Sequence, residues 1–162
     1  MNPSSVVDIL LVEDSALDAE LIIRALRRQS IANPLFLVED GAAALDFMFC
    51  RGAYAGRKMT RSPKVILLDL KLPKMTGLEV LGVLKAHPRT RDIPMVVVTS
   101  SQENPDIAAA YALGANSYVV KPVDADDFIE AMSKLGLYWL LVNQAPKSVI
   151  DEQLTAHTEI SI

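Results

Sequence analysis

Short apolar runs alternate along this chain with longer stretches in which apolar residues recur every three or four positions. The short runs have the length of buried strands, and the longer stretches have the periodicity of helices with one buried face. Repeated alternation of strand and helix is typical of crossover units that build a parallel sheet. We therefore predict an α/β fold, a doubly wound five-stranded parallel sheet with helices on both faces. The predicted strands are Val6–Val12, Pro34–Val38, Val65–Leu68, 93–101 and Ser117–Val120. The first predicted helix follows its cap Ser15, the next three cover Gly41–Phe49, Gly77–Ala86 and Ile107–Leu113, and the last begins at Ala125 with Asp124 as its cap.

Polar side chains follow four of the predicted strands, where the apolar runs stop. The carboxyl ends of parallel strands meet at one edge of the sheet, where folds of this class bind ligands. Each residue alone has an ordinary explanation, because acids and serines cap helices and a lone lysine is usually solvated. Their convergence on one edge favours a functional site. The residues are Glu13 and Asp14 after the first strand, Asp69 after the third, Thr99, Ser100 and Ser101 at the end of the fourth, and Lys121 after the fifth.

The carboxylates Glu13, Asp14 and Asp69 indicate a cation site. Gathered at one edge they repel one another, so we expect at least one raised pKa when no cation is bound. An all-oxygen cluster with few protein ligands suits Mg²⁺, which keeps several waters and usually completes its shell with a phosphate oxygen. Together with Lys121 and the Thr99 hydroxyl, such an ion would stabilise a phosphoryl group.

Composition narrows the classes of function. The 162 residues suffice for one domain with its own core, and a formal net charge of -4 does not favour nucleic acid as a partner. The amino terminus lacks the features of a signal peptide, and no apolar run approaches the ~20 residues needed to cross a membrane. The single cysteine, Cys50, cannot form an internal disulfide and fits a reducing compartment. We therefore expect a cytoplasmic protein that binds neither nucleic acid nor membranes.

Four blocks of sequence carry a family resemblance. LLVEDS, LLDLKLPKMTG, VVVTSS and SYVVKP occur in an order and spacing that resembles the receiver domains of two-component response regulators. The resemblance covers about residues 6 to 142 and implies the flavodoxin-like receiver fold. It also implies that Asp69 accepts a phosphoryl group from a phosphohistidine of a sensor histidine kinase.

The same resemblance assigns roles around Asp69. It implies that Glu13, Asp14, Asp69 and the backbone carbonyl of Lys71 hold Mg²⁺. It implies a phosphoryl-binding and switch group of Thr99, Ser100, Lys121 and Tyr118, in which Tyr118 reorients when Thr99 moves. It further implies a cis peptide before Pro122 that aims Lys121 inward, since cis bonds are accessible before proline.

Three features depart from the common family pattern. Glu13 replaces the frequent aspartate, and Thr76–Gly77 replaces a frequent Asp-Gly, although the glycine still permits a close backbone approach before the next helix. The connection 50–63 is long and carries Arg51, Arg57, Lys58 and Arg61, so it is either a solvated flexible loop or a contact surface for an acidic partner. This loop, together with YWLLV near the carboxyl terminus, resembles the single-domain regulators that pair with bacterial phytochromes.

By this resemblance, 1–142 is a receiver domain and 143–162 a tail without a separate output domain, because about twenty residues are too few for a further module. We expect a switch protein that at most catalyses its own phosphorylation and dephosphorylation. Two other functions stay open. One is a phosphorylation-independent adaptor of the same fold. The other is a metal-dependent phosphohydrolase, which usually needs a second acid near its nucleophile, whereas this chain has Lys71 two residues after Asp69.

The last predicted helix carries more apolar side chains than one buried face requires. At about 100° per residue, the five residues Tyr138, Trp139, Leu140, Leu141 and Val142 cover every side of a helix, so some of them point away from their own core. We interpret them as the interface of a homodimer. The alternative is that the tail covers the patch within one chain, through Val149, Ile150 and Leu154.

Overall fold

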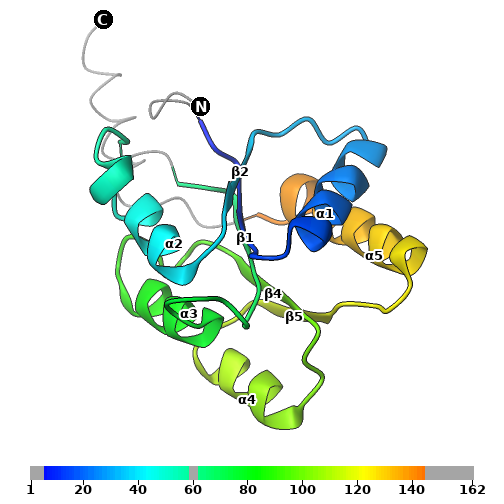
Figure 1. Cartoon of the computed structure of the whole chain (residues 1–162). Coiled ribbons are helices and arrows are strands. Elements are labelled where there is room, and N and C mark those ends of the chain that lie inside the picture. Colours follow the sequence, from blue (N-terminus) through cyan, green and yellow to red (C-terminus); the bar gives the residue numbers. More distant parts are fainter. Residues whose placement is uncertain (1–5, 59–61, 145–162) are drawn as a thin grey trace, which may run out of the picture.

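Five parallel strands form one sheet in the order β2-β1-β3-β4-β5, in a computed structural model that describes residues 6–58 and 62–144 (Figure 1). The predicted doubly wound fold is therefore confirmed. The strand order reverses at β1, which pairs with β2 on one side and with β3 on the other. The carboxyl ends of β1 and β3 therefore flank the crevice where such folds bind ligands. The strands are β1 Ile9–Val12, β2 Leu35–Val38, β3 Val65–Leu68, β4 Met95–Thr99 and β5 Ser117–Val120.

Helices cover both faces of the sheet, with α1 and α5 on one face and α2, α3 and α4 on the other (Figure 1). Each face has its own core, because successive strand residues point to opposite sides. Ile9 and Leu11 pack with the α1 and α5 layer, whereas Leu10 and Val12 pack on the opposite side. Strands β1, β3 and β4 are buried along their whole length, as their apolar runs predict. The helices are α1 Ala16–Arg28, α2 Gly41–Met48, α3 Gly77–Ala86, α4 Asn104–Ala112 and α5 Ala125–Leu137, with a 3₁₀ turn η1 at Gly52–Tyr54 and a π-helical turn η2 at Tyr138–Val142.

The predicted helix caps are in place. The Ser15 hydroxyl accepts a hydrogen bond from the backbone N–H of Asp18 at 3.2 Å, at the start of α1. At the start of α5, the Asp124 carboxylate accepts from the backbone N–H groups of Asp126 and Asp127 at 2.9 and 3.1 Å. These bonds satisfy N–H groups that have no partner within the helix, and they fix the direction in which each helix leaves the sheet.

Four predicted boundaries are wrong by two or three residues. Strand β1 begins at Ile9 rather than Val6, and β4 covers Met95–Thr99 rather than 93–101, because the ladder of hydrogen bonds is shorter than the predicted strands. Helix α4 begins at Asn104 rather than Ile107. Its first turn contains a proline and polar residues, which a helix tolerates there but which give no apolar periodicity to detect.

The described part of the long connection packs on the domain. Tyr54 contacts Phe36 and Phe47 edge-on, with ring centroids 5.7 and 5.3 Å apart, and the Arg57 guanidinium lies 3.4 Å from the centroid of the Phe47 ring. Arg51 pairs with Asp46 of α2 at 3.6 Å. Two of the four cations therefore already have partners within the chain, which weakens the interpretation as a contact surface for an acidic partner. Arg61 lies outside the described residues.

The chain leaves α5 through the turn η2, in which the Asn143 N–H donates to the Tyr138 carbonyl five residues earlier, at 2.7 Å. Leu140 is only 9% exposed and packs in the core beneath α1 and α5, so it does not belong to an interface. Tyr138, Leu141 and Val142 are 49%, 65% and 62% exposed. The predicted covering residues Val149, Ile150 and Leu154 lie outside the described residues. Within the described ranges, none of the helices has the length and apolar character that crossing a membrane requires.

Candidate functional site

Strand β3 delivers Asp69 to the edge of the sheet at a fixed position. Its backbone N–H donates to the Val12 carbonyl of β1 at 3.1 Å, and its side chain is buried. The loop then returns so closely that a Cβ added to Gly77 would lie 2.1 Å from the Asp69 carbonyl oxygen. This approach requires glycine, as the sequence predicts. Asp69 is therefore held from both sides, by the β1 strand and by the start of α3.

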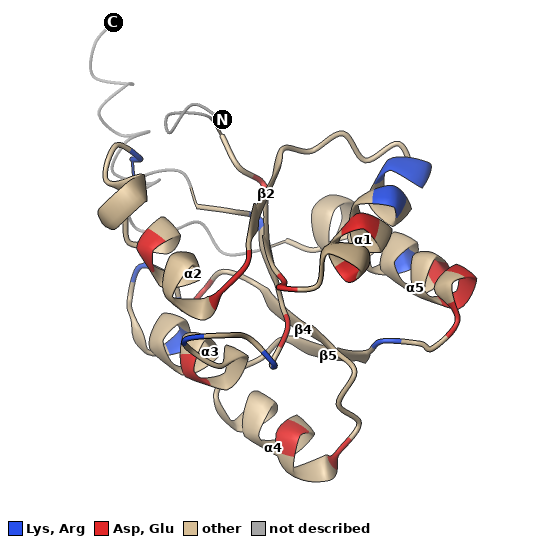
Figure 2. Cartoon of the chain, viewed as in Figure 1, with Lys and Arg blue, Asp and Glu red and all other residues tan. Residues whose placement is uncertain are grey.

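Glu13, Asp14 and Asp69 form the predicted acidic cluster. Each can offer a carboxylate oxygen such that the three oxygens lie within 4.8 Å of one another. Glu13 and Asp69 are buried while Asp14 is exposed, so the cluster is open to solvent on one side. In Figure 2 acidic positions are coloured red, and some of them lie where the strands in the middle of the sheet end. An all-oxygen donor set with a solvent-exposed side fits a hard divalent cation that retains water ligands.

Lys121 enters this cluster from the end of β5, and its ammonium contacts three carboxylates. Its Nζ lies 2.7 Å from Glu13 Oε2, 2.8 Å from Asp18 Oδ2 and 2.9 Å from Asp69 Oδ2, and its side chain is only 8% exposed. The implied cis peptide before Pro122 is wrong, since the described residues contain no cis peptide bond. The trans chain carries Lys121 inward, with its backbone N–H bonded to the Thr99 carbonyl at 2.7 Å.

Of the three carboxylates that contact Lys121, Asp18 is the one that the sequence analysis did not predict. It stands in the first turn of α1, where an acid is expected for its favourable interaction with the helix dipole, so it gives no separate signal. A clue was available, because α1 begins directly after the acidic pair at the end of β1. Its first turn must therefore lie at the same edge of the sheet as Glu13 and Asp14.

Burial and hydrogen bonds shift the pKa values of two residues in this cluster, Glu13 and Lys121. Burial raises the pKa of Glu13 to about 7, against the opposing effects of hydrogen bonds from Lys121 and from the Ser15 N–H. Burial alone would lower the pKa of Lys121, but its hydrogen bonds to Asp18, Glu13 and Asp69 outweigh this and raise it. The prediction of a raised carboxylate pKa is confirmed, although its main cause is burial, and repulsion by Asp69 contributes least. Lys121 thus partly neutralises a buried anionic cluster.

The predicted switch residues lie beside this cluster. Thr99 is fully buried at the end of β4, and its hydroxyl accepts a hydrogen bond from the Ser101 N–H at 3.4 Å. The Tyr118 hydroxyl donates to the Ser101 carbonyl at 2.9 Å, and burial raises the pKa of Tyr118. The Ser101 hydroxyl donates to Asp106 of α4. Ser100 is exposed. These bonds connect β5, the end of β4 and α4 into one unit next to Lys121.

Known proteins are similar in sequence to this chain over most of its length. The sequence profile described as the response regulator receiver domain matches residues 9–133. The probable methanogenesis regulatory protein FilR2 of Methanothrix harundinacea is 40% identical over 138 residues, which cover 85% of this chain and 86% of that protein. The response regulator Rcp1 of Synechocystis is 38% identical over 139 residues, which cover 86% of this chain and 91% of that protein.

Solved structures agree with the sequence comparison. The Mn(2+)-bound form of Rcp1 has a TM-score of 0.80 at 37% identity, covering 86% of this chain and 98% of that one. The phosphorylated cyanobacterial phytochrome response regulator RcpA has a TM-score of 0.81 at 33% identity, covering 88% and 100%. The bacteriophytochrome response regulator RtBRR has a TM-score of 0.69 at 43% identity, covering 96% of both chains. The flavodoxin-like fold implied by the sequence is confirmed, because this chain matches nearly the full length of each of these three structures.

Proposed function

The chain belongs to the response regulator receiver family, and we propose that within it Asp69 accepts a phosphoryl group from a sensor histidine kinase. The observation that carries this proposal is the environment of Asp69. Its carboxylate is buried, lies 2.9 Å from the Lys121 ammonium, and shares a cation-sized cluster with Glu13 and Asp14. A nucleophilic oxygen, a fixed positive charge and a metal site are the parts that phosphoryl transfer requires.

In the proposed reaction, a carboxylate oxygen of Asp69 attacks the phosphorus of the kinase phosphohistidine. The new P–O bond forms as the P–N bond breaks, and the leaving imidazole nitrogen keeps the electron pair and takes up a proton. Lys121 faces the negative charge on the phosphoryl oxygens, and Thr99 supplies a hydroxyl to one of them. The product is an acyl phosphate on Asp69, and the response is the change in contacts among Thr99, Ser101 and Tyr118.

Glu13, Asp14 and Asp69, with the backbone carbonyl of Lys71, are the proposed ligands of Mg²⁺. A divalent ion there would offset the repulsion between the Asp69 carboxylate and an incoming phosphate. The donor set supports this assignment, since three carboxylate oxygens gather within 4.8 Å and one of the residues is exposed. Rcp1, a relative of the chain, is known in a form bound to Mn(2+), an ion with similar oxygen preferences.

The direct experiment is incubation of the protein with acetyl phosphate, in Mg²⁺ or in EDTA, followed by separation on a phosphate-affinity gel. We expect a shifted band in Mg²⁺ and none in EDTA. A known receiver domain, treated in the same way, is the positive control for the gel. If that control shifts and this protein shifts in neither condition, the result counts against the proposal.

The proposed kinase is of the bacterial phytochrome type, acting in the cytoplasm. This proposal rests on RcpA and RtBRR, whose names record that association. Transfer from purified phytochrome kinases, compared with transfer from unrelated histidine kinases, tests it. A net charge of -4 gives no support to a nucleic-acid partner.

The alternative functions explain less of the site. A phosphohydrolase would usually place an acid near its nucleophile to protonate the leaving group, and the residue two positions after Asp69 is Lys71. An adaptor that ignores phosphorylation has no use for a buried lysine held among three carboxylates. Turnover of a chromogenic phosphate ester distinguishes the first, and the gel assay distinguishes the second.

Mg²⁺ affinity is expected to rise with pH and to level off above about 7, the raised pKa of Glu13. Below that pH the carboxyl group holds a proton that the ion must displace, so affinity should change by up to about tenfold per pH unit. Calorimetric titration in two buffers of different ionisation enthalpy measures the released proton. Glu13→Gln should abolish this pH dependence, and an unchanged slope in that variant would exclude Glu13 as the displaced acid.

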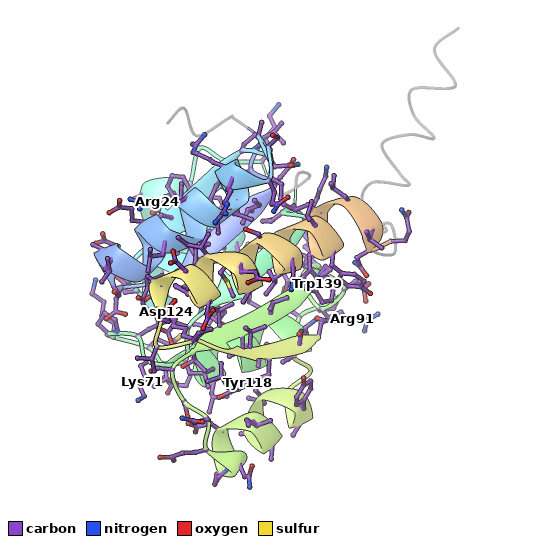
Figure 3. The ribbon with its side chains drawn as sticks, turned by 90° about the vertical axis from the view of Figure 1, so that its right-hand side faces the viewer. Arg24, Lys71, Arg91, Tyr118, Asp124 and Trp139 are labelled. Carbon is purple, nitrogen blue, oxygen red and sulfur yellow. The ribbon has the colours of Figure 1, made fainter. Side chains whose placement is uncertain are left out.

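We further propose a homodimer formed through Tyr138, Trp139, Leu141 and Val142. Tyr138 and Trp139 contact each other edge-on at 5.0 Å, and the two residues that follow Leu140 are largely exposed. Trp139 lies at the end of the domain opposite Lys71 and Asp124, so the surface is separate from the phosphoryl site (Figure 3).

Leu141→Glu combined with Val142→Glu is expected to give a folded monomer that still accepts phosphate, because charge on this surface opposes association. Val83→Glu on α3, another exposed apolar residue, is the matched control and should leave association unchanged. Light scattering coupled to gel filtration is the measurement. A wild-type protein that stays monomeric with and without beryllofluoride, a phosphoryl mimic, would contradict the dimer.

A further inference from the structure

One of the three carboxylates that hold Lys121 stands outside the acidic cluster. Glu13 and Asp69 belong to the trio whose oxygens could bind one cation, whereas Asp18 is not a member of that trio. Asp18 comes from a different element, the first turn of α1, and still lies 2.8 Å from the Lys121 ammonium. Its contact with Lys121 joins residues 103 positions apart in the chain.

We propose that Asp18 is a positioning residue, which keeps the Lys121 ammonium beside Asp69 when Glu13 and Asp69 turn to the cation and the phosphoryl group. The inference deepens the proposed function and rests on it. Asp18 is not one of the three residues of the cation cluster, and in the proposed role it acts through its contact with Lys121.

The donor count supports this role. A lysine ammonium has three N–H donors and no acceptor, and in this site each donor has one carboxylate: Glu13, Asp18 or Asp69. A cation that takes the oxygens of Glu13, and a phosphoryl group that caps Asp69, remove two of those three acceptors. Asp18 is the acceptor that neither event alters.

The surroundings of Asp18 suit an anchor. Its backbone N–H is fixed by the Ser15 hydroxyl at 3.2 Å, and α1 packs along α5 through a continuous core. Lysine carries its charge on a flexible stem, so without a fixed acceptor the ammonium would sample other positions. The Asp18 side chain is 29% exposed, which moderates the strength of the bond without removing it.

An ordinary role at the helix start makes a different prediction. If Asp18 served only to interact favourably with the α1 dipole, its loss would lower stability and leave ligand binding in the folded protein unchanged. If it positions Lys121, its loss weakens the binding of a phosphoryl mimic while the cation site is largely preserved. The two roles can therefore be distinguished by comparing the affinity for the phosphoryl mimic with the affinity for Mg²⁺.

The experiment compares Mg²⁺ binding by calorimetry with beryllofluoride binding in saturating Mg²⁺ by fluorine NMR. For Asp18→Ala we expect beryllofluoride affinity to fall about tenfold, the scale of one charge-assisted hydrogen bond, and Mg²⁺ affinity to change less than about threefold. Asp18→Asn keeps an acceptor oxygen and should fall between wild type and alanine. It also carries the test if the alanine variant does not fold.

The nitrogen NMR signal of the Lys121 ammonium, identified by its loss in Lys121→Met, gives a second readout. We expect a slowly exchanging signal in wild type and in Asp18→Asn, and a broadened one in Asp18→Ala. Glu20→Ala is the control, because it removes the same charge from the same helix at an exposed pair with Arg24, and it should match wild type.

Equal beryllofluoride affinity in wild type and both Asp18 variants would overturn the inference and leave the proposed function intact. Failure of wild type itself to bind beryllofluoride or to accept phosphate would instead refute the proposed function, and the inference with it.

Discussion

Asp69→Asn is expected to accept no phosphoryl group from acetyl phosphate or from a cognate kinase. The amide cannot supply the nucleophilic carboxylate oxygen, and the change removes one of the three carboxylate charges of the cation cluster. The fold should survive, because the backbone bond from residue 69 to the Val12 carbonyl and the close approach of Gly77 do not involve the side chain. Phosphate-affinity gels and far-ultraviolet circular dichroism measure the two outcomes.

Asp46→Asn is the matched control, since Asp46 makes an exposed ion pair with Arg51 and its change to an amide is chemically the same. It should be labelled at the wild-type rate. Labelling of Asp69→Asn at that rate would remove Asp69 from its assigned role.

Lys121→Met is expected to lower the free energy of unfolding in EDTA by about 3 kcal/mol, because it leaves buried carboxylates without their cation. The value lies at the low end for a broken buried ion pair, since Glu13, with its pKa raised to about 7, can take up a proton instead. Mg²⁺ should bind more tightly to this variant than to wild type and should restore much of the lost stability. Urea denaturation in EDTA and in Mg²⁺ provides the measurement.

Lys134→Met provides the comparison for this change. Lys134 pairs with Glu130 at 3.1 Å on the surface of α5, with both side chains mostly exposed, so its loss should cost no more than about 0.5 kcal/mol. If Lys121→Met were as stable as Lys134→Met in EDTA, the lysine would not be neutralising the cluster.

Much of the site could be predicted because the apolar runs that place strands in the middle of the sheet also determine which residues end at its edge. Strands β1 and β3 are apolar throughout, so they lie in the middle of the sheet, and the first polar residue after each must reach its edge. This reasoning identified Glu13 and Asp69, and it used only periodicity and the rule for parallel sheets. The close approach that Gly77 permits was expected from the conformational freedom of glycine, and a Cβ added there would meet the Asp69 carbonyl oxygen.

Contacts made by long side chains from separate elements could not be predicted in the same way. Asp18 has an ordinary reason to start a helix, and its bond to Lys121 depends on where β5 and α1 meet in space. Arg57 reads as a solvated cation, yet its guanidinium lies over the Phe47 ring, because the preceding turn η1 places Tyr54 on the same cluster.

Leu140 shows a different limit. The sequence argument assumed a rotation of about 100° per residue, which holds for an α-helix. The segment is instead a π-helical turn, in which the bond from Asn143 to Tyr138 spans five residues. Which residues of a fully apolar segment face inward depends on that local geometry, and it selects Leu140 for the core.

The identity of the phosphorylated residue is the central claim, and borohydride reduction tests it most directly. Borohydride converts an aspartyl phosphate to homoserine, which peptide mass spectrometry locates. After incubation with acetyl phosphate and Mg²⁺, the account predicts homoserine at position 69 and at no other aspartate of the covered peptides. Homoserine at Asp14 or Asp18 with Asp69 unmodified would contradict it.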